Sequence, residues 1–275
     1  MIAKYCLISG IAFLLFSCKG SHNRSVNTNT TNNTVPVLNI KYIHSYPHDT
    51  TSFTEGLLFH NGELFESTGS PEYLPQTRSL FGPVDLRTGR INKKAEINRS
   101  NYFGEGIAFL DGKVFQLTYK SRTGFAYDAT TFKKLKEFVI PRKEGWGLTT
   151  DGMNLIMSDG TYELTYLNPE TFQIIKKITV TENGIARGNL NELEYIKGFI
   201  YANIWTTNTI VKIDPGNGKV VGKLDLSLYA SEARYNYKGS LEMNGIAYDS
   251  VENRIFITGK LWPEIYEFQI LDGHN

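Results

Sequence analysis

The sequence contains very little cysteine. Its 275 residues include two cysteines, Cys6 and Cys18, and both lie close to the N-terminus. If the chain is cleaved before Cys18, the folded part has no internal thiol. The composition then excludes a disulfide framework and cysteine catalysis in the folded domain.

A strong charge of either sign is also absent. The chain has 29 basic and 28 acidic residues, which gives a formal net charge of +1. This balance argues against a nucleic-acid partner and against binding to an anionic surface. The histidines are scattered and have no metal-ligand spacing: His22, His44, His48, His60 and His274. We therefore expect no nucleic acid, no metal site and no required cofactor, and we treat any metal ion in the fold as adventitious.

The long apolar run of the chain is confined to its N-terminus. Lys4 precedes an apolar segment from Cys6 to Phe16, and Leu15-Phe-Ser-Cys18 resembles a lipoprotein cleavage site. This pattern predicts a lipoprotein signal peptide over residues 1–17 and a lipid on Cys18, which would anchor an exported protein in the bacterial cell envelope, facing the periplasm or in the outer membrane. An uncleaved anchor and simple secretion are the alternatives.

The segment after the predicted signal peptide has almost no apolar side chains. Residues 18–36 are rich in Ser, Asn and Thr. Such a segment does not bury a core, so we expect a flexible tether between the membrane and a domain over residues 37–275.

A repeat is the main feature of that domain. Two nearly identical strings, Phe53-Thr-Glu-Gly-Leu-Leu-Phe59 and Phe103-Gly-Glu-Gly-Ile-Ala-Phe109, lie about 50 residues apart. Each leads through Asn-Gly or Asp-Gly into a second apolar strand, which predicts a tight hairpin. Weaker copies follow in the same frame: Glu144-Gly-Trp-Gly-Leu148, Asn191-Glu-Leu-Glu-Tyr195 and Asn244-Gly-Ile-Ala-Tyr248.

Each unit continues with two further strand patterns. Third strands end in Asp before a turn, as in Phe125–Asp128 and Ile210–Asp214, and fourth strands follow, as in Leu135–Ile140 and Val220–Leu226. Five units of four strands predict an all-β fold, a five-bladed β-propeller.

The last unit has no fourth strand of its own. Its strands reach Ile270 and the chain then ends, while an unmatched strand, Val37–Tyr46, lies at the other end. We expect this N-terminal strand to close the last blade, because the pairing removes two free sheet edges. A short helix is expected within residues 226–241.

The first strand of each blade lines the central channel of a propeller. Superposing the five units places these residues at equivalent positions: Glu55, Glu105, Trp146, Asn191 and Asn244. A Glu-Gly pair destabilises a strand, because Gly weakens it and an inward carboxylate loses hydration. We therefore expect the two glutamates to be present for a reason other than stability. Two facing carboxylates raise each other's pKa, which makes one of them a usable acid and base near neutral pH. The alternative is that these glutamates accept backbone hydrogen bonds between blades.

The ordered set of motifs resembles the plant-type (papaya-like) glutaminyl-peptide cyclotransferases and their bacterial relatives. The resemblance spans the chain after the tether and rests on these strings among others: Phe53-Thr-Glu-Gly-Leu57, Tyr102-Phe-Gly-Glu-Gly106, Gly145-Trp-Gly-Leu148, Leu190-Asn-Glu-Leu-Glu-Tyr195 and Thr258-Gly-Lys-Leu-Trp-Pro263. It implies a five-bladed propeller enzyme, an acyltransferase that converts the N-terminal glutamine of peptides or proteins to pyroglutamate and releases ammonia. This type is unrelated to the zinc-dependent animal enzymes.

The resemblance also implies roles for individual residues. Glu105 is implied to be the catalytic acid and base, and the channel is implied to hold Phe53, Glu55, Trp146, Asn191, Trp205 and Lys260, with Phe103 and Tyr119 beside them. The plant proteins typically have Gln at the position of Glu55 and Trp near that of Tyr119. Asn191 and Lys260 are candidate donors to the oxyanion, and the aromatic residues are candidate pocket walls.

Several residues have simpler structural interpretations. Trp205 and Trp262 could pack between blades, Lys260 could lie on the solvent face, Glu192 and Glu194 are expected to be hydrogen-bonding residues, and Asp159 is expected in a turn. Two other functions also remain open: a noncatalytic envelope propeller that binds a peptide or protein partner, and a metal-dependent hydrolase or lactonase propeller.

Overall fold

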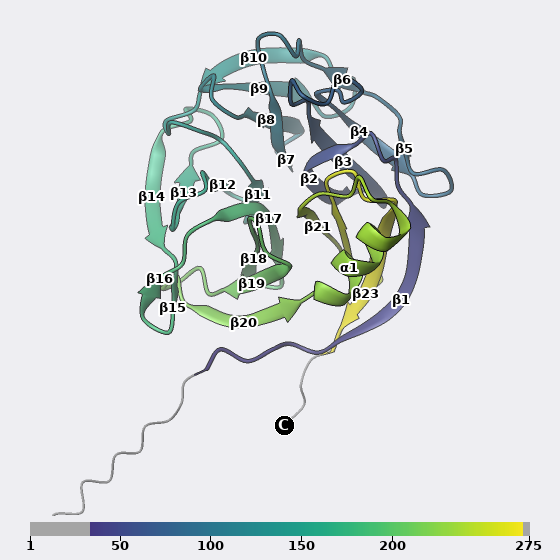
Figure 1. The fold of residues 1–275 in the computed structure, drawn as a ribbon. Helices are drawn as coiled ribbons and strands as arrows, with labels where there is room; N and C mark the ends of the chain where they lie inside the picture. Colours follow the sequence, from purple (N-terminus) through teal and green to yellow (C-terminus); the bar gives the residue numbers. More distant parts are fainter. Residues whose placement is uncertain (1–33, 272–275) are drawn as a thin grey trace, which may run out of the picture. The chain divides into compact units, whose positions relative to one another are not determined.

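The computed structural model describes residues 34–271, which form one ring of β-sheets (Figure 1). The predicted signal peptide, the lipidation site at Cys18 and nearly all of the predicted tether lie outside the described residues. Five sheets surround a central axis, which confirms the predicted five-bladed β-propeller.

Blades I to III follow one another along the chain. Blade I contains β2 (Phe53–His60), β3 (Glu63–Gly69), β4 (Leu80–Asp85), β5 (Arg90–Ile91) and β6 (Ala95–Glu96). Blade II contains β7 (Gly104–Leu110), β8 (Lys113–Thr118), β9 (Thr123–Asp128) and β10 (Lys134–Val139). Blade III contains β11 (Leu148–Thr150), β12 (Leu155–Met157), β13 (Glu163–Leu167) and β14 (Ile174–Thr179).

The remaining elements complete the ring. A separate two-stranded hairpin consists of β15 (Thr181–Glu182) and β16 (Ile185–Ala186). Blade IV contains β17 (Leu190–Ile196), β18 (Phe199–Ile204), β19 (Thr209–Ile213) and β20 (Val220–Asp225). Blade V contains β21 (Met243–Asp249), β22 (Arg254–Gly259), β23 (Glu264–Ile270) and β1 (Ile40–Pro47).

The predicted closure by the N-terminal strand is confirmed. β1 pairs antiparallel with β23, from Ile40 opposite Ile270 to Pro47 opposite Glu264. Just before β1, Val37 bridges Lys223 of β20 in blade IV. The N-terminal segment therefore joins the outer edges of the last two blades and covers the free edge of β23.

The hairpins between first and second strands follow the turn chemistry of the sequence. Asn61 and Gly62 both have positive φ, of 51° and 79°, and Asp111 and Gly112 repeat this at 50° and 70°. Positive φ at both central residues is the type I′ turn, whose twist matches that of the flanking strands.

Two features interrupt the regular four-strand pattern. In blade I the outer strand is replaced by β5 and β6, each two residues long and each paired with β4. Between blades IV and V the predicted helix forms as α1 (Ser227–Asn236), on the face at which β21 begins (Figure 1). No helix within residues 34–271 is long and apolar enough to cross a membrane.

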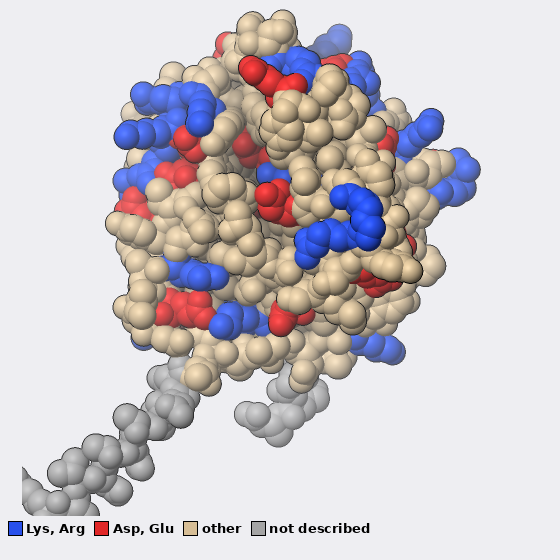
Figure 2. All heavy atoms as spheres, viewed as in Figure 1, with Lys and Arg blue, Asp and Glu red and all other residues tan. Residues whose placement is uncertain are grey.

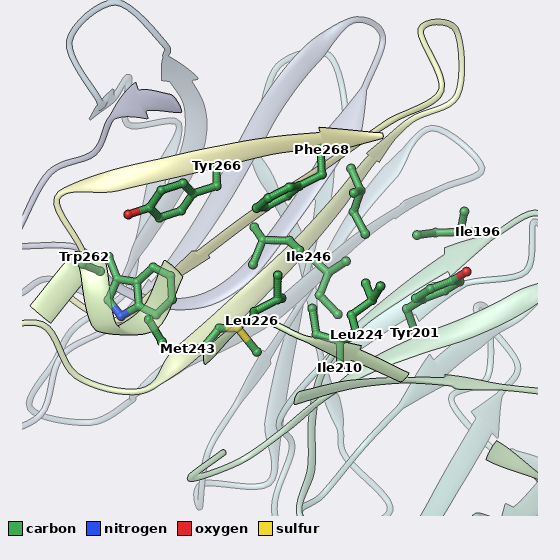
Figure 3. Close-up of a cluster of buried hydrophobic side chains, with 14 residues drawn as sticks. Ile196, Tyr201, Ile210, Leu224, Leu226, Met243, Ile246, Trp262, Tyr266 and Phe268 are labelled. Carbon is green, nitrogen blue, oxygen red and sulfur yellow. The ribbon is translucent and has the colours of Figure 1, made fainter. Parts of the chain in front are cut away.

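Apolar side chains fill the spaces between adjacent blades. Figure 3 shows the cluster between blades IV and V, where Leu224, Ile246 and Phe268 are fully buried. Trp262 lies in this cluster with no exposed surface, and its indole N–H donates to the carbonyl of Leu241 at 3.0 Å. Trp262 is therefore a packing residue, which confirms the interpretation that it packs between blades.

Candidate active site

The innermost strands of the five blades enclose the central channel. β2, β7, β11, β17 and β21 contact one another in this order around the ring. Four of these strands have a β-bulge at the residue that superposition of the repeats selects, namely at Glu55, Glu105, Asn191 and Asn244. The fifth residue, Trp146, lies two positions before β11. Bulges turn a side chain out of the regular alternation, which points these residues into one end of the channel.

A glycine follows four of the five channel residues, and its presence after Glu105 and Trp146 has a structural reason. A Cβ at Gly106 would lie 2.4 Å from the amide nitrogen of Leu148, and one at Gly147 would lie 2.2 Å from the carbonyl oxygen of Asn191. Neighbouring inner strands approach so closely that only glycine fits. The glycines of the repeat are thus explained by packing, whereas the glutamates are not.

A belt of hydrogen bonds joins the blades at the level of these five residues. Each junction between neighbouring blades has at least one such bond: Ser67 Oγ to Glu105 O, Gly106 N to Trp146 O, Ser158 Oγ to Asn191 O, Gly245 N to Asn203 Oδ1, and Asn244 Nδ2 to Thr54 O. The belt fixes the backbone carbonyls of Glu105, Trp146 and Asn191 to neighbouring blades.

The channel opens into a pocket of about 230 Å³. All nine residues predicted for catalysis and substrate binding line it: Phe53, Glu55, Phe103, Glu105, Tyr119, Trp146, Asn191, Trp205 and Lys260. Figure 2 shows the ring face that carries α1, with acidic and basic side chains in the hollow at its centre.

Three further residues line the pocket and were missed by the sequence analysis: Pro71, Tyr73 and Glu242. Glu242 lies two positions before Asn244, as Phe53 and Phe103 lie two positions before Glu55 and Glu105. The repeat therefore contained a signal for Glu242. Pro71 and Tyr73 belong to the loop between β3 and β4, which has no counterpart in the repeat.

Both oxygens of the Glu55 carboxylate have partners. Lys260 Nζ lies 2.8 Å from Oε1, and Asn244 Nδ2 donates to Oε2 at 3.0 Å. Burial raises the pKa of Glu55 to about 7, and Lys260 opposes this shift. Glu55 is therefore the fixed member of the carboxylate pair.

Glu105 differs from Glu55 in having no hydrogen-bond partner for its carboxylate among the described residues. Its side chain is buried, and its backbone carbonyl is held by Ser67. Burial, followed by the charge of Glu55, raises the pKa of Glu105 well above its usual range, and Lys260 opposes the shift. The carboxyl group is positioned, keeps its proton to higher pH than an ordinary glutamate and is open to a ligand.

Lys260 lies inside the pocket, so the interpretation of this residue as solvent-facing is wrong. It is 6% exposed, and its Nζ lies 4.5 Å from the centre of the Phe53 ring. Burial lowers the pKa of Lys260, but Glu55 and Glu105 more than offset this and raise it overall. A permanently charged ammonium group therefore faces two carboxyl groups.

Asn191 contributes an amide group that is not used by the protein. Its Oδ1 is buried and has no hydrogen-bond partner. Buried polar atoms are nearly always paired, so an unpaired one that lines a pocket is available to a ligand.

Five aromatic residues form a continuous wall from blade I to blade IV. Each ring contacts the next, with centroid separations of 5.9, 5.9, 6.3 and 5.5 Å along the series Phe53, Phe103, Tyr119, Trp146 and Trp205. The indole N–H of Trp146 donates to Glu144 at 2.9 Å. Trp205 is 39% exposed at the mouth, so it is not a buried packing residue.

Three other carboxylates near the channel have structural contacts. Glu192 accepts the backbone N–H groups of Leu57 and Ile246, and Glu194 accepts that of Tyr248. Asp159 accepts the N–H of Thr161 in a turn and also pairs with Arg142. These contacts confirm the structural interpretation of all three residues.

The structure has no metal-ligand cluster in the part of the chain that it describes. Within residues 34–271, no three His, Cys, Asp or Glu side chains are arranged to hold a metal ion. The absence of a required cofactor stays a prediction.

Three comparisons with known proteins agree with this site. Residues 13–270 match the model of a family described as glutamine cyclotransferase. Over 272 residues the chain is 38% identical to the glutaminyl-peptide cyclotransferase of Arabidopsis thaliana, covering 98% of this chain and 83% of that protein. The crystal structure of Myxococcus xanthus glutaminyl cyclase superposes with a TM-score of 0.73 at 33% identity, covering 86% of this chain and 100% of that one.

Proposed function

Since the chain belongs to the glutamine cyclotransferase family and cyclises N-terminal glutamine in peptides, we propose that Glu105 is the general acid and base of the reaction. The observation that carries this proposal is the contrast within the carboxylate pair. Glu55 has a partner for each oxygen, whereas the Glu105 carboxylate has none among the described residues and faces the pocket.

The reaction requires one group to move a proton in both directions. The carboxylate of Glu105 takes a proton from the substrate α-ammonium group, and the neutral amine attacks the side-chain amide carbon. The resulting C–N bond closes a five-membered ring and places negative charge on the amide oxygen. When that intermediate collapses, Glu105 returns the proton to the departing nitrogen, which leaves as ammonia. The carboxylate of Glu105 then takes the second proton from the ring nitrogen and passes it to ammonia or to solvent, which leaves neutral pyroglutamate. A raised pKa suits both steps near neutral pH.

Lys260 and Asn191 are placed to stabilise the negative charge of the intermediate. The Lys260 ammonium group and the side-chain amide of Asn191, whose Nδ2 is a donor, line the same pocket as Glu105. Fixed donors in a buried site stabilise a developing oxyanion more strongly than water does. Glu55 holds Lys260 in place and, together with Glu242, attracts the positive amine of the substrate.

The aromatic wall promotes ring closure by restricting the substrate. A pocket of about 230 Å³ admits one glutamine residue, not a longer segment of peptide. Phe103, Tyr119 and Trp146 fold the side chain back towards its own amine and keep water out, so that the intramolecular attack is favoured.

We also propose that the enzyme is exported and attached to the cell envelope through a lipid on Cys18. The support is the lipoprotein-like string ending at Cys18 and the polar segment that follows it. The full chain should incorporate labelled palmitate and fractionate with membranes, whereas Cys18→Ala should not incorporate the label. Equal labelling of both would refute the anchor.

The enzyme assay tests the role of Glu105. The purified protein is incubated with a Gln-Xaa peptide, and ammonia release and the matching loss of mass are measured, with and without EDTA. We expect turnover that survives EDTA, and a loss of about a thousandfold or more in Glu105→Gln with the fold retained. Activity of Glu105→Gln close to that of the wild type would refute the assignment, and inhibition by EDTA would indicate a metal-dependent reaction.

A further inference from the structure

Directly behind the pocket, His48 and Glu66 form a fully buried pair whose side chains are both 0% exposed. We propose that this pair positions Lys260 against Glu55, and so sets the geometry of the catalytic pocket from outside it. The inference rests on the proposed roles of Lys260 and Glu55. Neither His48 nor Glu66 lines the pocket.

Both ring nitrogens of His48 lie within hydrogen-bond distance of oxygen atoms. Nε2 lies 3.1 Å from each oxygen of Glu66, and Nδ1 lies 2.8 Å from the carbonyl oxygen of Trp262. Both nitrogens therefore face acceptors, an arrangement that suits an imidazolium ion beside a carboxyl group. Burial lowers the pKa of His48, but Glu66 more than offsets this and raises it overall.

On one side the pair holds the turn that carries Lys260. His48 bonds the carbonyl of Trp262 through its ring and that of Pro263 through its backbone N–H, at 2.9 Å. Between these contacts and Lys260 lies Leu261, whose φ of +58° is unfavourable for a branched side chain. A strained residue needs outside support, and the imidazolium ion supplies part of it.

On the other side the pair holds the strand that carries Glu55. Thr54, the residue before Glu55, donates its hydroxyl to Glu66 Oε1 at 2.7 Å. Glu66 therefore contacts β2 directly and reaches the Lys260 turn through His48. One buried carboxylate links the two halves of the Lys260–Glu55 ion pair.

The propeller scaffold does not require a charge at this position. Glu66 pairs across the hairpin with Leu57, two residues after the channel residue Glu55. The residues at the equivalent place in the other blades carry no charge: Gln116, Met157, Ala202 and Ile257. Burying an ion costs free energy, and the other blades pack this place without one. The charge of Glu66 is therefore explained by the residues that it positions rather than by packing.

Two substitutions of Glu66 separate positioning from packing. Glu66→Met places there the residue that blade III has at Met157, and it removes both hydrogen bonds. Glu66→Gln retains them, because its oxygen accepts from Thr54 and its amide donates to a neutral His48. We expect kcat to fall about tenfold to a hundredfold in Glu66→Met with KM changed less than about threefold, and Glu66→Gln to restore most of the activity.

A stability control and a double-mutant cycle complete the test. Phe81→Leu weakens the packing of the same blade, where Phe81 is fully buried, and should lower Tm without changing kcat. In a Lys260→Met background, Glu66→Met should cause little further loss, because its effect passes through Lys260.

Three results would overturn the proposal: wild-type kcat in Glu66→Met, equal losses in Glu66→Met and Glu66→Gln, or fully multiplicative losses in the cycle. Full activity of Lys260→Met alone would instead refute the proposed role of Lys260, so the two failures are distinguishable.

Discussion

The central channel contains two pairs of buried carboxyl groups that differ in what they bind. Glu55 and Glu105 line the pocket, whereas Glu192 and Glu194 bond to strands two to four residues further along, about 7 Å or more deeper. Burial raises the pKa of all four, to about 7 for Glu55 and about 8 for Glu194. A raised pKa alone therefore does not identify the catalytic pair.

The hydrogen-bond partners make the distinction. Innermost strands have N–H groups with no strand to pair with on the channel side, and the deeper pair accepts those of Leu57, Ile246 and Tyr248. The pocket pair accepts no backbone N–H, and Glu105 has no partner for its carboxylate among the described residues. Carboxylates of the deeper layer complete the scaffold, and those of the upper layer are available for chemistry.

Removal of the positive charge of Lys260, which faces Glu55 and Glu105, should have the largest effect on activity. Lys260→Met keeps the length of a buried side chain but removes the proposed oxyanion donor, so kcat should fall by about 10² to 10³. The pKa of Glu105 should rise, because Lys260 holds it down, and the acid limb of the kcat/KM profile should move to higher pH.

Steady-state kinetics across pH measure both effects of Lys260→Met. Lys176→Met is the control, since Lys176 lies on the outer strand β14 and its Nζ packs over the Tyr166 ring. An acid limb that stays in place would contradict the electrostatic role of Lys260.

The deeper pair should show the opposite behaviour, a loss of stability with little loss of activity. Glu192→Ala leaves the N–H groups of Leu57 and Ile246 unpaired between three blades, so the free energy of unfolding should fall by about 3 kcal/mol. Glu192→Gln keeps one acceptor oxygen and should lose about half as much. Urea unfolding gives the stability, and kcat per folded molecule should stay within about threefold of the wild type. A catalytic defect as large as that of Lys260→Met would remove the distinction between the two layers.

The repeat predicted much of this arrangement. The period of the sequence located the blades, the closing strand and all five channel residues, because one supersecondary unit is copied around a ring. It did not predict which glutamate is free. Glu55 and Glu105 occupy equal places in the repeat, and the partners that distinguish them, Lys260 and Asn244, come from another blade. Only the closed ring brings these residues together.

Substitution of the fixed member of the pocket pair should change the pH dependence more than the rate. The charge of Glu55 raises the pKa of Glu105, so Glu55→Gln should lower it, and the acid limb of kcat/KM should move to lower pH. The rate at neutral pH should fall less than about tenfold, since an amide oxygen at position 55 still accepts from Lys260 and Glu105 keeps its position through Ser67. The profile of kcat/KM between pH 5 and 9 tests this, and a shift to higher pH would show that Glu55 acts mainly by another route.

The smallest effect belongs to Glu194, and it concerns stability against pH. The pKa of Glu194 is about 8 in the folded protein, against 4.5 as its ordinary value. Between these values the native state holds a proton that the unfolded chain releases, so stability falls as pH rises through that window. Glu194→Gln cannot ionise, and Gln still accepts the N–H of Tyr248 through its oxygen. Its Tm should equal that of the wild type near pH 4.5 and exceed it by about 2 to 4 °C or more at pH 8. A difference in Tm that is the same at both pH values would mean that Glu194 is ionised over the whole of this pH range. Glu194 would then resemble the pocket pair in its place in the channel but not in having a raised pKa.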